Sequence, residues 1–328
     1  MIPRILVLVL MWSVWGAAQV SAAPPRVVAS IAPLSGIAAA VAGDRATVEL
    51  LLPPSASPHL YQLRPGEARR LARADLVLWV GPQLEGPLAR AITSLAGGAE
   101  LLTALELPGV RLLPLRTPHA HGEEDHEGHG HGERDHEGGE AADHGEGAVD
   151  PHLWLDPENA KVIARALADA LVRRDPDGAQ VYRAALAAFE VRVDALADEL
   201  RALLEPVRER PFLVAHDSFQ YFERFFGLRG LGALVISPEL PAGARSFAEL
   251  VERARAAGVV CIFAEPQMDR RLVERVAAEV GARIGELDPV GLGLEPAPDS
   301  WSALMRRNAE SLVACLAGQD GGSRASTR

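Results

Sequence analysis

The sequence has no excess of positive charge: its 328 residues include 33 basic and 44 acidic side chains, a formal net charge of −11. A partner held through phosphate contacts needs a basic surface, so this balance argues against nucleic-acid binding. Beyond the first 22 residues, no uninterrupted apolar segment reaches the ~20 residues that span a bilayer. A charged fraction of 23% and a hydrophobic fraction of 48% instead predict a soluble chain of about two domains.

Common catalytic signatures are also missing. The sequence contains no His-Glu-x-x-His pattern, no phosphate-binding P-loop and no Gly-x-Ser-x-Gly elbow. It also has no Cys-x-x-Cys pair, which argues against a thiolate metal site. Because the familiar metalloprotease, nucleotide-hydrolase and α/β-hydrolase motifs are absent, the sequence gives no support to an enzymatic function.

The first 22 residues have the pattern of a cleaved signal peptide. Arg4 precedes an apolar run at 5–18, and small residues at 20–22 suit a signal peptidase that cuts after Ala22 or Ala23. The alternative is an N-terminal membrane anchor, but the run is shorter than the ~20 residues that such a helix needs. We therefore expect an exported protein without a lipid anchor, since no cysteine lies near the cleavage site.

The chain has two cysteines, Cys261 and Cys315. Export would place them in an oxidising compartment, where a single pair favours a structural disulfide. The alternative is two separate buried thiols.

Apolar strands alternate with short helices in two parts of the chain, which predicts an α/β fold with parallel sheets. We expect an N-terminal lobe at 24–155, a helical segment at 157–209 with a long helix from about residue 178, and a C-terminal lobe at 211–318. Residues 118–147 are almost entirely His, Gly, Glu and Asp, so we expect a disordered loop there. The tail at 319–328 is also expected to be disordered.

Histidine is distributed in two groups. Seven histidines lie in the acidic loop: His119, His121, His126, His129, His131, His136 and His144. A purely solvated charge run needs no histidine, so this loop is interpreted as an accessory metal-binding segment. The other three, His59, His152 and His216, stand singly beside predicted strand ends or helix starts.

Three imidazoles at the carboxyl ends of strands can meet at one point and suit Zn²⁺. The alternative is that each histidine forms an ordinary hydrogen bond within its loop. Asp288, which follows a predicted strand, is the candidate fourth ligand, with water as the competing choice.

Carboxylates near the predicted strand ends suggest supporting roles. Glu265 follows a predicted strand and is expected to orient a ligand histidine from behind, a role that Asp217 or Asp156 also suits. Alternatively, Asp288 and Asp156 cap helices or turns.

Several motifs together resemble the periplasmic zinc-binding proteins of ABC importers, the ZnuA-type members of the cluster A-I solute-binding family. They are SPHLYQLRP at 57–65, DPHLWLDP at 150–157, AHDSF at 215–219, FAEPQ at 263–267 and the acidic histidine-rich insert. The Cys261 and Cys315 pair fits as well. The resemblance covers residues 26–318.

The resemblance implies two Rossmann-like α/β lobes joined by a long rigid α-helix, with the metal in the cleft between the lobes. It implies that His59, His152 and His216 bind zinc, because manganese-binding relatives carry a carboxylate at the place of His216. In some zinc-binding relatives a glutamate just before the first histidine approaches the metal. Here that residue is Pro58, which leaves Asp288, water or a histidine of the acidic loop for the fourth position.

The function implied is zinc capture in the periplasm and delivery by a monomer to the inner-membrane permease of an ABC importer. One alternative is a secreted zinc-dependent hydrolase, since a catalytic zinc also has three protein ligands and an open position. Another is a metal buffer or chaperone that works without an importer.

Overall fold

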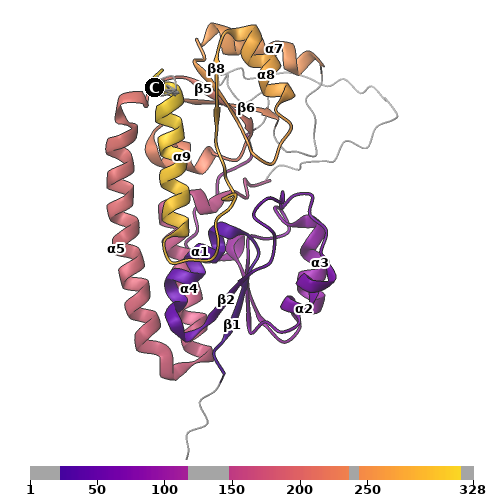
Figure 1. The fold of residues 1–328 in the computed structure, drawn as a ribbon, viewed down its shortest axis with the longest axis vertical. Helices are drawn as coiled ribbons and strands as arrows, with labels where there is room; N and C mark the ends of the chain where they lie inside the picture. The colour runs from indigo at the N-terminus through magenta and orange to yellow at the C-terminus, as the bar shows by residue number, and fades with distance from the viewer. Residues whose placement is uncertain (1–22, 117–147, 236–243, 319–328) are drawn as a thin grey trace, which may run out of the picture.

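A computed structural model describes residues 23–116, 148–235 and 244–318. The predicted signal peptide, the whole histidine-rich loop at 118–147 and the predicted disordered tail lie outside the described residues. Two four-stranded parallel sheets lie one above the other along the long axis of the molecule (Figure 1). The predicted two-lobed α/β fold is therefore confirmed. In the described part of the chain, no helix is long and apolar enough to cross a membrane.

The N-terminal sheet has the strand order β2-β1-β3-β4. Its strands are β1 (Arg26–Ala29), β2 (Thr47–Leu50), β3 (Leu76–Trp79) and β4 (Glu100–Thr103). The helices α2 (Pro65–Leu71) and α3 (Gly86–Leu95) lie beside one face, and α1 (Ala32–Ala42) and α4 (Pro157–Arg174) beside the other (Figure 1). All residues of β3 are buried, as expected for a parallel strand covered on both faces.

The C-terminal sheet repeats this arrangement with the order β6-β5-β7-β8. Its strands are β5 (Phe212–His216), β6 (Gly230–Val235), β7 (Cys261–Ala264) and β8 (Arg283–Glu286), and its helices include α6 (Gln220–Phe226), α7 (Ala244–Ala256) and α8 (Arg271–Val280). In both sheets the first strand in sequence pairs with the second on one side and with the third on the other. Ligands of open α/β sheets bind beyond the carboxyl ends of strands at such a reversal of strand order.

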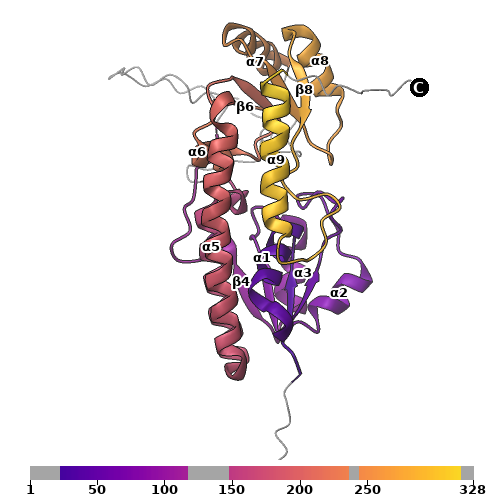
Figure 2. The ribbon, with the colours of Figure 1, turned by 60° about the vertical axis from the view of Figure 1, so that its left-hand side comes forward.

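A long helix, α5 (Ala179–Leu204), runs past both sheets, and α9 (Ser300–Leu316) lies beside it (Figure 2). At 1.5 Å per residue its 26 residues extend for about 39 Å. The helix is shorter than the predicted 178–209, because short 3-10 turns flank it. The second turn contains Pro206, which has no backbone N–H to continue an α-helix.

The sequence assigns α9 to the C-terminal lobe, but the structure shows that this helix contacts both lobes. Its first residues press against Gly36 of α1. A Cβ atom at Gly36 would lie 2.5 Å from Ser300 Oγ and 2.8 Å from the backbone nitrogen of Trp301, so only glycine permits this approach. The other end is fixed by a disulfide between Cys261 of β7 and Cys315, which confirms the predicted disulfide bond.

Candidate metal centre

The structure brings His59, His152 and His216 together. The ring centroids lie 5.6 Å apart for His59 and His152, 5.3 Å for His59 and His216, and 4.8 Å for His152 and His216. Each offers one ring nitrogen, and these atoms lie within 4.8 Å of one another. Among the described residues, this is the one group of three histidine, cysteine or acidic side chains with such spacing. Because these histidines come from both lobes, the group lies between the two sheets.

A loop after β2 carries His59, and two backbone turns shape it. Ala56 N–H donates to the Pro53 carbonyl at 2.9 Å, and Leu60 N–H donates to the Ser57 carbonyl at 3.3 Å. Beyond the histidine, the buried Glu67 of α2 accepts a hydrogen bond from the backbone N–H of Arg64 at 2.7 Å and from the hydroxyl of Tyr61 at 2.7 Å. The loop is therefore attached to α2 on the side that follows His59.

His152 lies just before a 3-10 turn at Leu153–Leu155 and is 3% exposed. Its Nδ1 and its backbone N–H both contact Asp150 Oδ1, at 2.7 Å and 2.9 Å. A carboxylate on Nδ1 fixes the tautomer in which Nε2 carries the free lone pair. Asp150 is fully buried and also receives a hydrogen bond from Gln220 Nε2 at 3.4 Å.

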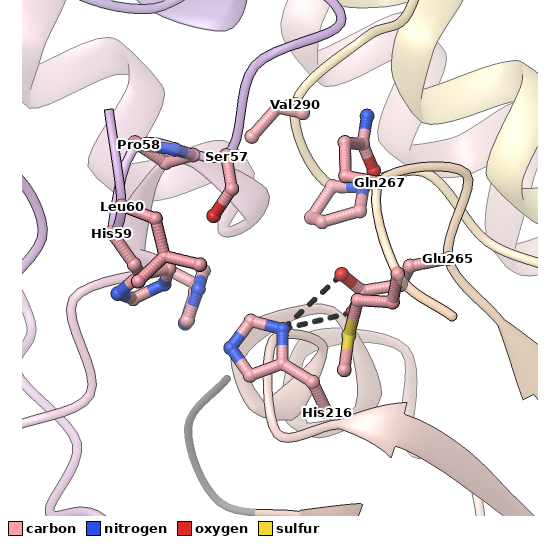
Figure 3. Close-up of a pocket in the computed structure, with 11 residues that line it drawn as sticks. Ser57, Pro58, His59, Leu60, His216, Glu265, Gln267 and Val290 are labelled. Atoms are coloured by element: carbon pink, nitrogen blue, oxygen red, sulfur yellow. Dashed lines mark hydrogen bonds and ion pairs between the residues drawn. The ribbon is translucent and has the colours of Figure 1, made fainter. Parts of the chain in front are cut away.

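His216 is the last residue of β5, and Glu265 follows the neighbouring strand β7. His216 Nδ1 lies 3.0 Å and 3.2 Å from the two Glu265 carboxylate oxygens (Figure 3). Ser218 Oγ donates to Glu265 Oε1 at 2.6 Å and holds this carboxylate in place. On the other side of the ring, Nε2 is buried and has no hydrogen-bond partner within the part of the chain that the structure describes. A buried ring nitrogen without a partner is suited to bind a metal ion.

Burial and charge give the three histidines different proton affinities. Burial, followed by His152 and His216, lowers the pKa of His59 to about 2. Burial, and then His216, holds the pKa of His152 well below its usual value, although Glu265 opposes this. Burial also opposes a charge on His216, but Glu265, helped by Asp150 and Asp217, outweighs it and raises the pKa of His216. At neutral pH two of the imidazoles, His59 and His152, are therefore neutral and ready to bind a cation. At His216 a metal ion must compete with a proton.

A pocket that is partly open to solvent surrounds the imidazoles. Figure 3 shows His59 with Ser57 and Pro58 on one wall, and Gln267 and Val290 on the opposite wall. The first wall comes from the N-terminal lobe and the second from loops of the C-terminal lobe. A ligand in this pocket therefore contacts both lobes.

Asp288 lies outside the group of close ligand atoms. Its carboxylate accepts hydrogen bonds from the backbone N–H groups of Val290, at 3.1 Å, and Gly291, at 2.9 Å, and also from that of Leu292. Gln267 Nε2 donates to the same carboxylate at 3.2 Å. In this structure Asp288 stabilises a turn, which is the alternative role considered for it from the sequence.

The predicted supporting carboxylates divide into two kinds. Glu265 contacts the His216 imidazole, whereas Asp217 pairs with Arg116, at 3.5 Å, and Asp156 caps α4 by accepting from the backbone N–H of Glu158 at 2.8 Å. The carboxylate behind His152 is Asp150, which sequence analysis did not single out. Asp150 precedes His152 by two residues, with Pro151 between them, and this proximity was the sequence feature that could have identified it.

Comparisons with known proteins support one family. The model of the family described as zinc-uptake complex component A, periplasmic (ZnuA), matches residues 27–315. The high-affinity zinc uptake system protein ZnuA of Brucella abortus is 37% identical over 304 residues, covering 88% of this chain and 91% of the relative. The protein of the same name from Yersinia pestis is 36% identical over 295 residues, with coverages of 90% and 92%.

Solved structures show the same fold. A crystal structure of ZnuA superposes with a TM-score of 0.73 at 26% identity, covering 90% of this chain and 100% of that one. The periplasmic zinc-binding protein TroA of Treponema pallidum gives a TM-score of 0.74 at 23% identity, covering 90% and 99%. At this lower identity the likeness concerns the fold alone.

Proposed function

This chain belongs to the ZnuA family of zinc-uptake components, and from that premise we propose that it captures Zn²⁺ outside the cytoplasm and delivers it to an ABC importer. The observation that carries the proposal is the meeting of three imidazoles from distant parts of the chain, with ligand atoms within 4.8 Å of one another. Neutral imidazoles are preferred nitrogen ligands of zinc. The ion is the transported substrate, so the site must both hold and release it.

The proposed ligands are His59, His152 and His216. Zinc–nitrogen bonds of ~2.0–2.1 Å place tetrahedral ligand atoms about 3.4 Å apart, so small side-chain rotations bring these rings to one ion. Asp150 and Glu265 on the opposite nitrogens orient two of the rings and increase their basicity. The arrangement favours zinc over metals that prefer oxygen ligands.

For the fourth position we propose water or a histidine of the histidine-rich loop rather than Asp288. To reach the metal, Asp288 must release the backbone amides of Val290 and Gly291. X-ray absorption of the zinc-loaded chain, compared with its Asp288→Asn variant, distinguishes these choices. We expect the same coordination shell in both proteins, with three imidazole scatterers if water is the fourth ligand and four if a loop histidine is. A loss of one light scatterer in the variant would restore Asp288 as a ligand.

The histidine-rich loop is proposed to raise the local zinc concentration through weak, shared sites on its seven histidines. We expect deletion of residues 119–147 to slow zinc capture at low ion concentration while the tight site keeps its affinity. Loss of the tight site in this deletion would instead mean that the loop supplies a ligand.

We further propose a monomer, exported by cleavage after Ala22 or Ala23, whose partner is an inner-membrane permease. Mass spectrometry of the mature chain tests the cleavage, and sedimentation tests the oligomeric state.

Stimulation of importer ATP hydrolysis by the zinc-loaded chain in proteoliposomes, compared with the metal-free chain, tests the partner. If neither form stimulates ATP hydrolysis, the result would favour a metal buffer that works without an importer.

The hydrolase alternative is not favoured, because the matched relatives are named for zinc uptake. The decisive measurement for the proposed function is competition between the chain and a chelator of known zinc affinity. We expect one tight zinc ion in the wild type and in a His144→Ala variant, and none in His152→Ala. Tight binding that survives in His152→Ala would contradict the proposed site.

A further inference from the structure

Trp154 contacts the metal centre and the opposite wall of the pocket at the same time. It lies two residues after His152, is fully buried, and its ring meets the His152 imidazole edge to face, with centroids 5.4 Å apart at 60°. Its indole N–H donates to the carbonyl of Pro289 at 2.8 Å. Pro289 lines the pocket from the C-terminal lobe. One side chain therefore joins a proposed zinc ligand to a wall carried by the other lobe.

The segment that Trp154 holds is the turn at residues 288–292, here called the Asp288 turn. Its backbone amides at Val290 and Gly291 donate to the Asp288 carboxylate, so the turn has a fixed shape. Asn308 of α9 accepts from the Asp288 N–H at 2.8 Å and donates to its carbonyl at 2.8 Å. These hydrogen bonds give the Asp288 turn a defined shape and tie its first residue to α9.

Trp301 provides a second indole in the same region with a different task. Its N–H donates to the backbone carbonyl of Trp154 at 3.0 Å. Both indole hydrogen bonds are buried, and both involve Trp154. However, the bond from Trp301 reaches backbone in the N-terminal lobe, whereas the bond from Trp154 reaches the pocket wall. The two tryptophans therefore form a natural pair for comparison.

We propose that Trp154 is a positioning residue that holds the Asp288 turn closed over the metal centre and thereby slows zinc release. This inference rests on the proposed function. Zinc bound by the three imidazoles faces a wall that includes Pro289 and Val290, so the ion leaves more easily when this wall moves outward. In the closed arrangement the Trp154 N–H satisfies a buried carbonyl, and in an opened arrangement water can satisfy both groups. The hydrogen bond therefore favours the closed state over the open one.

Removing the indole N–H should raise the population of open molecules without changing the zinc ligands. We expect Trp154→Phe to accelerate zinc dissociation about tenfold, the effect of losing one buried hydrogen bond of ordinary strength. The association rate should change less than twofold. Stopped-flow mixing of zinc-loaded protein with excess chelator measures the first rate, and mixing of metal-free protein with zinc measures the second.

Trp301→Phe is the matched control, because it removes an indole N–H of similar burial that does not reach the pocket wall. We expect its dissociation rate to stay within twofold of the wild type, while thermal melting of the metal-free proteins shows similar losses for both variants. An unchanged dissociation rate in Trp154→Phe, or equal acceleration in Trp301→Phe, would overturn the proposal. A wild-type chain that binds no zinc would instead overturn the proposed function.

If Trp154→Phe does not fold, hydrogen exchange of the indole protons in the wild type gives an independent answer. We expect the Trp154 indole N–H to exchange more slowly with zinc bound than without it, because the ion holds the two walls together. The Trp301 indole N–H should exchange equally in both states. Zinc-independent exchange at Trp154 would overturn the proposal.

Discussion

The two lobes share one strand order but place different chemistry at the same point. In the N-terminal sheet, Ser30 directly follows β1, and its hydroxyl donates to Glu85, which follows β3, at 2.5 Å. In the C-terminal sheet, His216 ends β5, and its imidazole contacts Glu265, which follows β7. Each pair lies where the strand order reverses, and each carboxyl group is buried.

The difference between the pairs explains why only one belongs to the candidate metal centre. Glu85 also accepts hydrogen bonds from the backbone N–H groups of Val80 and Gly81, and burial raises its pKa to about 7. The Ser30–Glu85 pair is therefore internally satisfied. In the other pair, His216 keeps a buried Nε2 without a partner among the described residues. The fold thus supplies an equivalent location twice, and the side chain decides whether it becomes a ligand site.

The largest expected effect on zinc affinity comes from replacing His216, and Ser30, at the equivalent place in the other sheet, is its control. His216→Ala should reduce zinc affinity by more than the ~10–100-fold that loss of a partner behind a ligand costs. Ser30→Ala should leave zinc affinity within twofold and lower the free energy of unfolding by about 1–3 kcal/mol, because it leaves a buried carboxyl with one donor fewer. Chelator competition and chemical denaturation measure the two quantities. A large affinity loss in Ser30→Ala would make the lobes functionally equivalent.

Exchanging the two carboxylates for amides sharpens the comparison. Glu265→Gln should weaken zinc binding about 10–100-fold, because His216 loses the charged group that orients it and increases its basicity. Glu85→Gln should leave zinc affinity unchanged. Isothermal titration of both variants tests this difference, and equal effects would contradict it.

The Glu85 variant should also change the pH dependence of stability. Because the folded-state pKa of Glu85 is about 7, above its ordinary 4.5, its stabilising contribution is full below 4.5 and is lost as pH rises through 7. Between pH 5 and pH 8 this loss is on the order of 2 kcal/mol in the wild type. Denaturation curves of Glu85→Gln should lack most of it.

A smaller effect distinguishes the imidazoles from one another. Zinc must displace the proton of His216, whose pKa is raised above 6.5, whereas His59 and His152 are already neutral. Asp150, whose pKa is about 7, can release a second proton. We therefore expect affinity to fall as pH falls below 7, by one to two powers of ten per pH unit, not three.

Titration of zinc affinity between pH 5 and pH 7 measures this slope. Asp150→Asn should reduce it to one power of ten per unit, since His216 is then the remaining proton source. A slope of three in the wild type would mean that His59 or His152 is also protonated before zinc binds.

Sequence patterns predicted the fold and the three histidines for a clear physical reason. Alternating apolar strands and short helices indicate parallel sheets. Only three histidines lie outside the acidic loop, and each stands beside a predicted strand end or helix start, so they were clear candidates. Glu265 was predicted on the same basis. That these residues bind zinc remains a proposal to be tested by the variants above.

Contacts between distant segments could not be read from the sequence. Asp156 and Asp217 looked as suitable as Glu265, but the partner of each depends on packing between elements, and they contact a helix terminus and Arg116. Asp288 follows a strand end as predicted, but the course of the next four residues directs backbone amides onto its carboxylate. The contact of Trp154 with Pro289 spans 135 positions and has no local signature.

The seat of Trp301 and Ser300 on Gly36 has a consequence for how the protein matures. One side of α1 is covered only by α9, a helix made about 265 residues later in the chain. A nascent chain therefore exposes the α9-facing side of α1 until this helix has been made. Truncation before residue 300 should yield an aggregation-prone, protease-sensitive product even though every strand of both sheets is present.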